Sequence, residues 1–478
     1  MLHARRRRLC RVIAAGALAS AAVLPSALAR ADTLEGALAQ AYQNNPTLNS
    51  QRALVRATDE GVPQALSGYR PKVSLNATGG QQSLSSTSKV VGSTVLPGTP
   101  ATYFTQSGYN STYGAGATVT QTLYNGFQTA NKTRQAESAV FAARETLRNT
   151  EQQVLLSAAT AYMNLLRDSA ILDLQRRNVE VLQEQLRQTR DRFNVGEVTR
   201  TDVAQSESSL AQGRSQVLSA EATYTASVAT YRQVIGVNPG KLAPGTPVDR
   251  FSPTALPLAI ALGSAEHPTV SSAQYNVDVA EQAVKVAEGA LLPTVSVQGS
   301  FQQNYFPVGS LNTVESYNAS VLGQVSVPIY QGGSEYSAIR QAKETLGQKR
   351  IDLDTARDTV RQAVVQAWGQ LQAGKANIEA TQAQVTASEI ALNGVREEAR
   401  VGQRTTLDVL NAQQALVNSR VALVTAQHDR VVASYSLLAA VGRLSPQVLG
   451  LRVSVYDAAV HYHQVRDAWT GVRNPDGR

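Results

Sequence analysis

Two stretches of the sequence are near copies of each other: VGEVTRTDV at Val195–Val203 and VGQRTTLDV at Val401–Val409. They begin 206 residues apart, and an upstream pair, VTQTLYNG ending at Gly126 and VSVPIYQG ending at Gly332, has the same spacing. Neither copy therefore contains a net insertion between these landmarks. Self-similarity at a fixed spacing indicates a duplicated structural unit, and its constant length indicates that the unit is rigid.

The spacing changes upstream of these landmarks, where Pro71 matches Pro293 at an offset of 222 residues. The 16 additional residues of the first copy therefore lie between Pro71 and Tyr124. Because changes of length are typical of surface loops, we expect a longer loop in this part of the first copy.

A long helix is predicted before each of the two near-identical stretches. Proline is absent between Pro100 and Pro239, and again between Pro328 and Pro446. In both copies apolar residues recur every seven positions, except for one step of eleven. The first series is Val140, Leu147, Val154, Leu165, Leu172, Val179, Leu186 and Phe193. The second is Leu346, Leu353, Val360, Leu371, Ile378, Val385 and Leu392. A seven-residue repeat imposes a left-handed supercoil. The step of eleven adds four residues to one repeat, a stutter that relaxes the supercoil. We expect helices of about 68 residues, or about 100 Å; the alternative is a pair of ordinary bundles with hidden breaks.

The two near-identical stretches themselves are predicted to be turns between antiparallel helices. Gly196 and Gly402 suit the left-handed conformation that ends many helices. Thr201 and Thr405 are the expected N-caps of the returning helices.

Four strands are predicted from a period of two, in which apolar side chains alternate with small polar ones: residues 72–78, 109–123, 295–301 and 317–327. This pattern is typical of a transmembrane β-barrel, with lipid outside and water inside; a half-buried soluble sandwich would share it. The segments between the paired strands, 83–108 and 304–316, are rich in Gly, Ser and Thr and are expected to be extracellular loops. Four strands cannot close a barrel, and open edges are not tolerated in lipid, so the chain is expected to oligomerise.

The N-terminal 31 residues have the pattern of an export signal, with basic residues before an apolar stretch at 12–24 and small residues before Asp32. This segment contains Cys10, the one cysteine of the chain. It also contains six of the 44 Lys and Arg and none of the 36 acids, so the rest of the chain has 38 basic and 36 acidic residues. This balance gives no reason to expect nucleic-acid binding.

The chain resembles the TolC family of outer-membrane efflux proteins, and the resemblance rests on PIYQGG at Pro328–Gly333, VGQRTTLDVL at Val401–Leu410 and VGEVTRTDV at Val195–Val203. It implies a mainly α protein with a transmembrane β-barrel part. Three chains would share one barrel, four strands each, and a long periplasmic tube of coiled-coil helices. The expected function is the outer-membrane exit channel of a tripartite efflux pump or a type I secretion system.

The resemblance also implies partners: a periplasmic adaptor (membrane fusion protein), an inner-membrane transporter of the RND, MFS or ABC class, and outer-membrane lipid. The chain end, with His461 and Trp469, is similar to members associated with type I secretion. The adaptor would contact the turns at Val195, Gly196, Val401 and Gly402. The alternative function from the residues alone is a periplasmic adaptor or other coiled-coil scaffold.

The resemblance further implies a gate at the periplasmic entrance. Asp408 matches an aspartate that rings the closed entrance, and Asn411 stands where the prototype has a second ring of aspartates. Arg404 matches an arginine that bonds across to the first-half turn, where the matching residues are Thr201 and Asp202. The simpler alternative for both aspartates is that they are acids placed at helix N-termini, where the helix dipole favours them.

No other chemistry is predicted. A Walker-like string at Gly369–Lys375 is followed by Ala376 and lies in a predicted helix with no preceding strand. His461 and His463 could bind a metal but have no acidic or cysteine cluster near them in the sequence. We therefore expect no enzyme activity, no cofactor and no metal site.

These expectations divide the chain into nine segments. They are a signal peptide at 1–31, helices before the first strands at 32–71, strands with their loop at 72–125, a helical hairpin at 126–235, an equatorial linker at 236–262, a helix at 263–293, strands with their loop at 294–330, a second hairpin at 331–441 and a C-terminal equatorial segment at 442–478.

Overall fold

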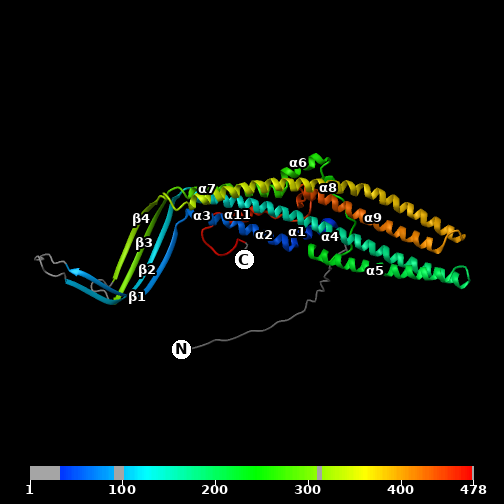
Figure 1. Cartoon of the computed structure of the whole chain (residues 1–478), viewed down its shortest axis with the longest axis horizontal. Helices are drawn as coiled ribbons and strands as arrows, with labels where there is room; N and C mark the ends of the chain where they lie inside the picture. The colour runs from blue at the N-terminus through cyan, green and yellow to red at the C-terminus, as the bar shows by residue number, and fades with distance from the viewer. Residues whose placement is uncertain (1–32, 91–101, 309–314, 476–478) are drawn as a thin grey trace, which may run out of the picture.

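The computed structural model describes residues 33–90, 102–308 and 315–475, so the predicted signal peptide lies outside the described residues. The molecule is long, with a curved sheet at one end and long helices over the rest of its length (Figure 1). No helix within the described ranges combines the length and the apolar character that a membrane-spanning helix needs.

The sheet has four antiparallel strands in the order β1-β2-β3-β4: Lys72–Val90, Thr102–Asn125, Thr294–Val308 and Glu315–Ser326. The strands are longer than predicted, because much of the segment 83–108 and part of 304–316 belong to strands and not to loops. Apolar alternation fades there, but the backbone ladder continues between small polar residues. For example, the hydroxyl groups of Thr87 and Thr105 lie 2.8 Å apart across the β1–β2 pair.

The register places apolar and polar side chains on opposite faces of the sheet. Directly paired residues share a face. Val119 pairs with Val73 and with Gly299, and its neighbour Thr118 pairs with Ser74 and Ser300. One face is therefore lined by valine and small residues and the other by hydroxyl groups. This segregation is the one that the period-two pattern predicts.

Two helical hairpins form most of the chain. The long helices are α4 (Gln128–Asn194) and α8 (Ser334–Arg400), each of 67 residues. They return as α5 (Arg200–Ile235) and α9 (Thr406–Ala440). The predicted length of the long helices is confirmed, and neither contains the break that ordinary bundles would need.

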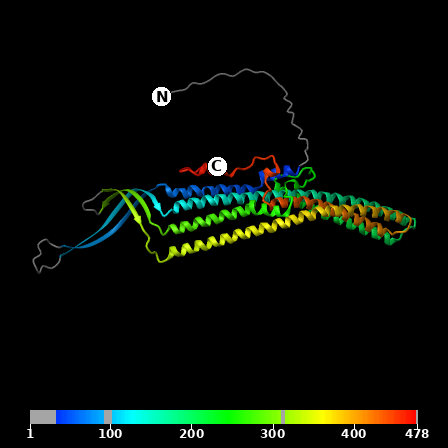
Figure 2. The same ribbon diagram turned by 90° about the horizontal axis from the view of Figure 1, so that it is seen from above.

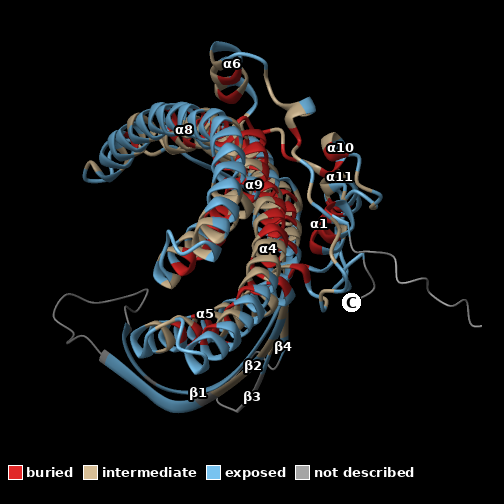
Figure 3. Cartoon of the chain, turned by 90° about the vertical axis from the view of Figure 1, so that its right-hand side faces the viewer, coloured by how far each residue is buried: buried red, intermediate tan, exposed pale blue. Residues whose placement is uncertain are grey.

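The heptad seam forms the hairpin cores. Its buried members are Val140, Leu147, Val154, Leu165, Leu172, Leu186, Leu353, Val360, Leu371, Val385 and Leu392. Val179, Leu346 and Ile378 are half-buried, and Phe193, at the last turn of α4, is 42% exposed. Figure 3 shows the buried positions concentrated along α4 and α9, where the two hairpins meet. Burial of this seam, more than helix propensity, stabilises helices of such length.

Shorter helices surround the middle of the molecule and connect it to the sheet. They are α1 (Leu34–Asn44), α2 (Pro46–Asp59), α3 (Gly61–Leu66), α6 (Leu256–Glu266), α7 (Pro268–Gly289), α10 (Pro446–Leu449) and α11 (Ala458–Val465). Helix α6 begins inside the segment predicted as a linker. Helices α2 and α7 are the duplicated pair, and each starts with a side-chain cap. Asn45 Oδ1 accepts from Thr47 N at 2.9 Å, and His267 Nδ1 accepts from Thr269 N at 3.2 Å.

Candidate functional site

Each hairpin has a turn of the same type, and both turns lie at the end of the molecule away from the sheet (Figures 1 and 2). Gly196 and Gly402 have φ of +82° and +79°, the left-handed conformation that glycine adopts without strain. In the first turn Glu197 N donates to Arg192 O at 2.9 Å and Gly196 N donates to Phe193 O at 3.0 Å. These two bonds make a Schellman motif, which satisfies the last carbonyl groups of α4.

The returning helices begin with matched capping boxes at Thr199 and Thr405. Asp202 Oδ2 accepts from Thr199 N at 3.0 Å, and the Thr199 hydroxyl accepts from Asp202 N at 3.3 Å. The corresponding bonds between Asp408 and Thr405 are 2.9 and 3.2 Å long. The prediction of Thr405 as an N-cap is confirmed.

The prediction of Thr201 as the first N-cap is wrong. The box needs a threonine three residues before the aspartate, and Thr199 has this position. The 206-residue offset also matches Thr199 to Thr405, while Thr201 matches Leu407. The spacing T-x-x-D was therefore the sequence signal that identifies the caps.

These bonds keep both aspartates ionised. The hydrogen bond from the Thr199 hydroxyl is the largest of the causes that lower the pKa of Asp202 below its ordinary value. For Asp408 the largest cause of the lowered pKa is the bond from the backbone N–H of Thr405. The two carboxylates therefore remain negative at neutral pH, at the N-termini of α5 and α9, where the helix dipole also favours negative charge.

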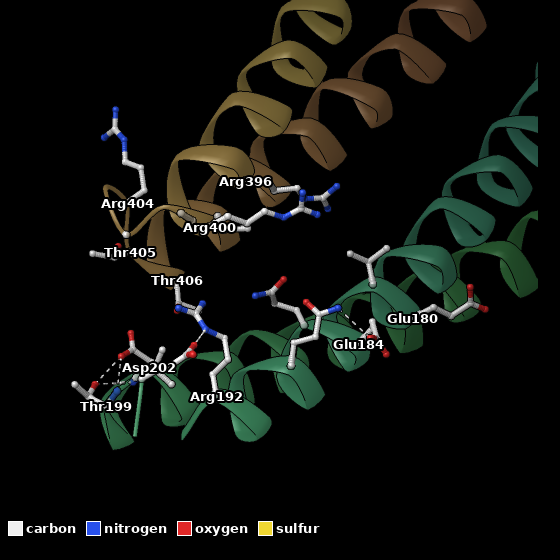
Figure 4. A pocket seen from close by; sticks show the side chains of 18 residues that line it. Glu180, Glu184, Arg192, Thr199, Asp202, Arg396, Arg400, Arg404, Thr405 and Thr406 are labelled. Atoms are coloured by element: carbon white, nitrogen blue, oxygen red, sulfur yellow. Dashed lines mark hydrogen bonds and ion pairs between the residues drawn. The ribbon is translucent and has the colours of Figure 1, made fainter. Parts of the chain in front are cut away.

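Arg404 does not contact Thr201 or Asp202 within this chain. Its Nε donates to Glu398 Oε2 at 2.8 Å, across the second turn. Figure 4 shows the Arg404 side chain extending away from the turn that carries Thr199 and Asp202. A bond from Arg404 to the first-half turn therefore remains a prediction for contacts between chains. Asn411 is exposed and lies three residues after Asp408 in α9.

A cavity of about 760 Å³ lies between the two hairpin ends. Arginines from both hairpins line it: besides Arg404 they are Arg192, Arg396 and Arg400 (Figure 4). Arg192 is paired with Glu197 at 2.9 Å and Arg400 with Glu397 at 3.0 Å. Sequence reasoning missed these arginines, because they lie on helix faces that no motif marks.

A buried polar bridge joins the two hairpins beside this cavity. Gln413 Nε2 in α9 donates to Asn178 Oδ1 in α4 at 3.2 Å, and both side chains are buried. Arg396 Nη2 donates to the same glutamine at 3.0 Å. An apolar cluster that includes Leu186 and Leu410 packs close by. These contacts join the two hairpins through α4 and α9.

The described part of the chain contains no group of three or more His, Cys, Asp and Glu that could hold a metal ion. His461, one of the two histidines considered for metal binding, instead faces Asp59, with Nδ1 and Oδ2 3.0 Å apart.

A curved sheet with one apolar face, continued by two long helical hairpins, is the architecture of one chain of an outer-membrane channel that extends into the periplasm. The sequence pattern of the outer membrane efflux protein family matches residues 37–237 and 260–443, and the chain belongs to this family. The resemblance inferred from its motifs is confirmed. The protein is thus an exit channel for efflux or secretion, located in the outer membrane, in a family of channels and not of enzymes.

Named relatives support this assignment. The chain is 43% identical to the outer membrane efflux protein BepC of Brucella suis, over 98% of both sequences. It is 26% identical to the outer membrane protein TolC of Escherichia coli, over 89% of this chain and 85% of that protein. Among solved structures, the CmeC outer membrane channel of Campylobacter jejuni has the same fold, with a TM-score of 0.72 at 18% identity over 91% of this chain and 89% of that one.

Proposed function

We propose that three copies of the chain form one channel, with a shared barrel in the outer membrane and a shared tube in the periplasm. The observation that carries the proposal is the open sheet: β1 and β4 are its outer strands, and each has a neighbour on one side only. Unpaired strand edges are not tolerated in lipid. Pairing β4 of one copy with β1 of the next closes the sheet without changing the fold of the chain.

The number of copies rests on the TolC resemblance, since two copies would already supply about the smallest number of strands found in such barrels. Mass measurement of the detergent-extracted protein tests it. Three chains per particle are expected, while a stable monomer inserted in lipid would contradict the shared barrel. Single cysteines introduced into β1 and β4 provide a second test, because the chain has no cysteine besides Cys10. Disulfides should form between chains.

The paired turns are proposed as the docking site of a periplasmic adaptor, which connects the channel to an inner-membrane transporter of the RND, MFS or ABC class. Val195, Gly196, Val401 and Gly402 are all exposed at the end of the molecule opposite the sheet. Two exposed valines beside two glycines offer an adaptor helix an apolar surface with close access to the backbone.

Substitution of Gly402 tests the docking site. A Cβ at this glycine would meet no atom within 4 Å, so a large side chain has room, although the positive φ strains any side chain placed there. Gly402→Trp should abolish export while leaving the assembled channel in the membrane. Gly402→Asn is the control, since asparagine tolerates the left-handed conformation and adds little bulk. Normal export by the Gly402→Trp protein would place the docking site elsewhere.

The entrance to the tube is proposed to close through the charged residues of the turns. Asp408 from each copy would converge on the axis, with Asn411 one helical turn above it. Arg404 would exchange Glu398 for Thr201 or Asp202 of a neighbouring copy. An open duct would breach the outer-membrane barrier, so a closed resting state is required.

The transported compounds are drugs, other small molecules or unfolded protein, with no bound cofactor taking part.

A further inference from the structure

The C-terminal segment returns to the periplasmic end of the sheet. Helix α11 packs on α2, and the chain then continues beside α3 towards the start of β1 (Figures 1 and 2). Arg70 fixes this segment in two ways. Its Nη1 donates to Ala468 O at 2.6 Å, and its guanidinium lies over the Trp469 ring, 4.7 Å from the centroid.

Arg70 marks the end of the sheet, because β1 begins at Lys72. The preceding residue is also tied to the sheet, since Gln121 Nε2 in β2 donates to Tyr69 O at 3.0 Å. Trp469 is therefore held at the level where the strands of the membrane part give way to the helices of the periplasmic part.

The side chains around this point are aromatic and basic, and all but the half-buried Arg70 are exposed. Trp469 is 68% exposed and Tyr69 is 54% exposed, although both are large rings. Arg70 and Lys72 add positive charge beside them. Tryptophan and tyrosine at a membrane–water boundary place an apolar ring among the lipids and a polar edge in water. Basic residues there attract the phosphates of lipid headgroups.

The second copy of the repeat shows that this arrangement is not required to start a strand. Tyr69-Arg70-Pro71-Lys72 matches Leu291-Leu292-Pro293-Thr294 at the offset of 222 residues. The second copy keeps the proline but has neither the aromatic ring nor the charges. The aromatic and basic residues therefore occur only in the copy to which the C-terminal segment returns.

We infer that Trp469, with Tyr69, Arg70 and Lys72, anchors the channel to phospholipid headgroups in the periplasmic leaflet of the outer membrane. The C-terminal segment acts as a strap that carries the tryptophan to this boundary. The inference rests on the outer-membrane location and is independent of the number of copies and of the adaptor-docking site.

The composition of the chain allows a direct test, because Trp368 and Trp469 are its two tryptophans. Trp368 lies in α8, 34 residues after the first residue of that helix and thus roughly 50 Å from the sheet. The Trp368→Phe protein, reconstituted in vesicles of phosphatidylethanolamine and phosphatidylglycerol, reports on Trp469 alone. Lipids brominated near the ester carbonyl groups should quench its emission strongly. Lipids brominated deep in the acyl chains should quench it less.

The Trp469→Phe protein is the matched control, because Trp368 should be quenched by neither lipid. Arg70→Leu copies the second repeat and should reduce the quenching of Trp469 towards that control. The inference is overturned if neither lipid quenches Trp469, which would show that water or another protein surface covers the ring. It is equally overturned if the deep bromines quench more than the shallow ones, or if Arg70→Leu leaves the quenching unchanged.

Discussion

Arg404 and Glu398 form an ion pair that closes the second periplasmic turn upon itself, with Nε 2.8 Å from Oε2. About half of each side chain is exposed, 51% for Arg404 and 46% for Glu398. An ion pair so exposed contributes little to stability, because water screens both charges. Arg404 can therefore exchange this partner for one on a neighbouring chain at little cost, as the proposed gate requires.

The first prediction concerns this exchange. Arg404→Ser should raise single-channel conductance in planar bilayers, because the closed entrance loses its bond to the first-half turn of the neighbour. Glu398→Gln should not raise it, because it removes only the competing partner within the chain. If both variants raise conductance equally, the pair acts by shaping its own turn. If the Arg404→Ser channel has the same conductance as the unsubstituted channel while the assembly stays intact, the gate depends on other residues.

The second prediction concerns the capping boxes. Thr199→Ala and Thr405→Ala should each destabilise the start of the returning helix by about 0.5–2 kcal/mol, the usual cost of losing an N-cap side chain. Hydrogen exchange followed by mass spectrometry should show faster exchange in the first turn of α5 or α9. Thr201→Ala is the matched control, since Thr201 is exposed and is not the cap. Faster exchange in that variant would contradict the assignment of Thr199.

The architecture was predictable where a pattern extends over many residues. The seam from Val140 to Leu186 repeats in α8, so one unusual position such as Phe193 does not alter the prediction. The alternation around Val119 likewise fixes which residues share a face of the sheet. Long-range periodicity averages over local exceptions, and therefore the helix lengths and the two faces of the strands followed from the sequence.

The details of the site were less predictable, because they depend on single positions. Thr199 and Thr201 are chemically the same, and only their distance from Asp202 decides which of them is the cap. The partner of Arg404 depends on where Glu398 lies in the last turn of α8, which no family motif specifies. The polar ends of β1 and β2 lack the apolar alternation that would have revealed their length.

The third prediction concerns the orientation of the sheet. Val119 lies on the apolar face and its neighbour Thr118 on the polar face, at the same depth. Val119 pairs with Val73, one residue from Lys72 and thus near the membrane boundary, where an arginine on the lipid face costs about 0–1 kcal/mol. Val119→Arg should therefore reduce the amount of assembled channel in outer-membrane fractions more than Thr118→Arg, which adds its charge on the water side. Equal effects would mean that the apolar face does not meet lipid.

The fourth prediction concerns Asp59 and His461, which join α2 to the C-terminal helix α11. Asp59 is fully buried, and burial is the main cause that raises the pKa of its carboxyl group above the ordinary value. His461→Leu leaves this buried group without its hydrogen-bond partner, which costs about 1–3 kcal/mol. Trypsin should then cleave the C-terminal segment faster, at Arg466 and Arg473.

Asp59→Asn is the comparison for this pair. It keeps an oxygen for the histidine ring and removes the charge that is costly to bury, so the C-terminal segment should resist trypsin better than in His461→Leu. If the two variants are cleaved equally fast, the buried charge is not what makes the loss of His461 costly.

The last prediction concerns the negative charge at the entrance. Asp408 has two roles, since its carboxylate completes the capping box of α9 and would also face the axis of the assembled tube. Asp408→Asn separates them, because asparagine is a good N-terminal hydrogen-bond acceptor but has no charge. It should weaken the block of current by multivalent cations while leaving hydrogen exchange in α9 nearly unchanged. Thr405→Ala should leave the block by cations nearly unchanged and speed hydrogen exchange at the start of α9. Asn411→Asp, which adds a second ring of charge, should strengthen the block.

The pH dependence of the block provides an independent check. Because the bonds from Thr405 lower the pKa of Asp408 in the folded protein, the carboxylate is charged throughout the range above the ordinary aspartate pKa of about 3.9. The block, and the contribution of the capping box to stability, should therefore be fully present above that pH. Both should be lost together as the pH falls through the lowered pKa. Block that disappears well above pH 4, or that survives unchanged in Asp408→Asn, would show that the cations bind to other groups.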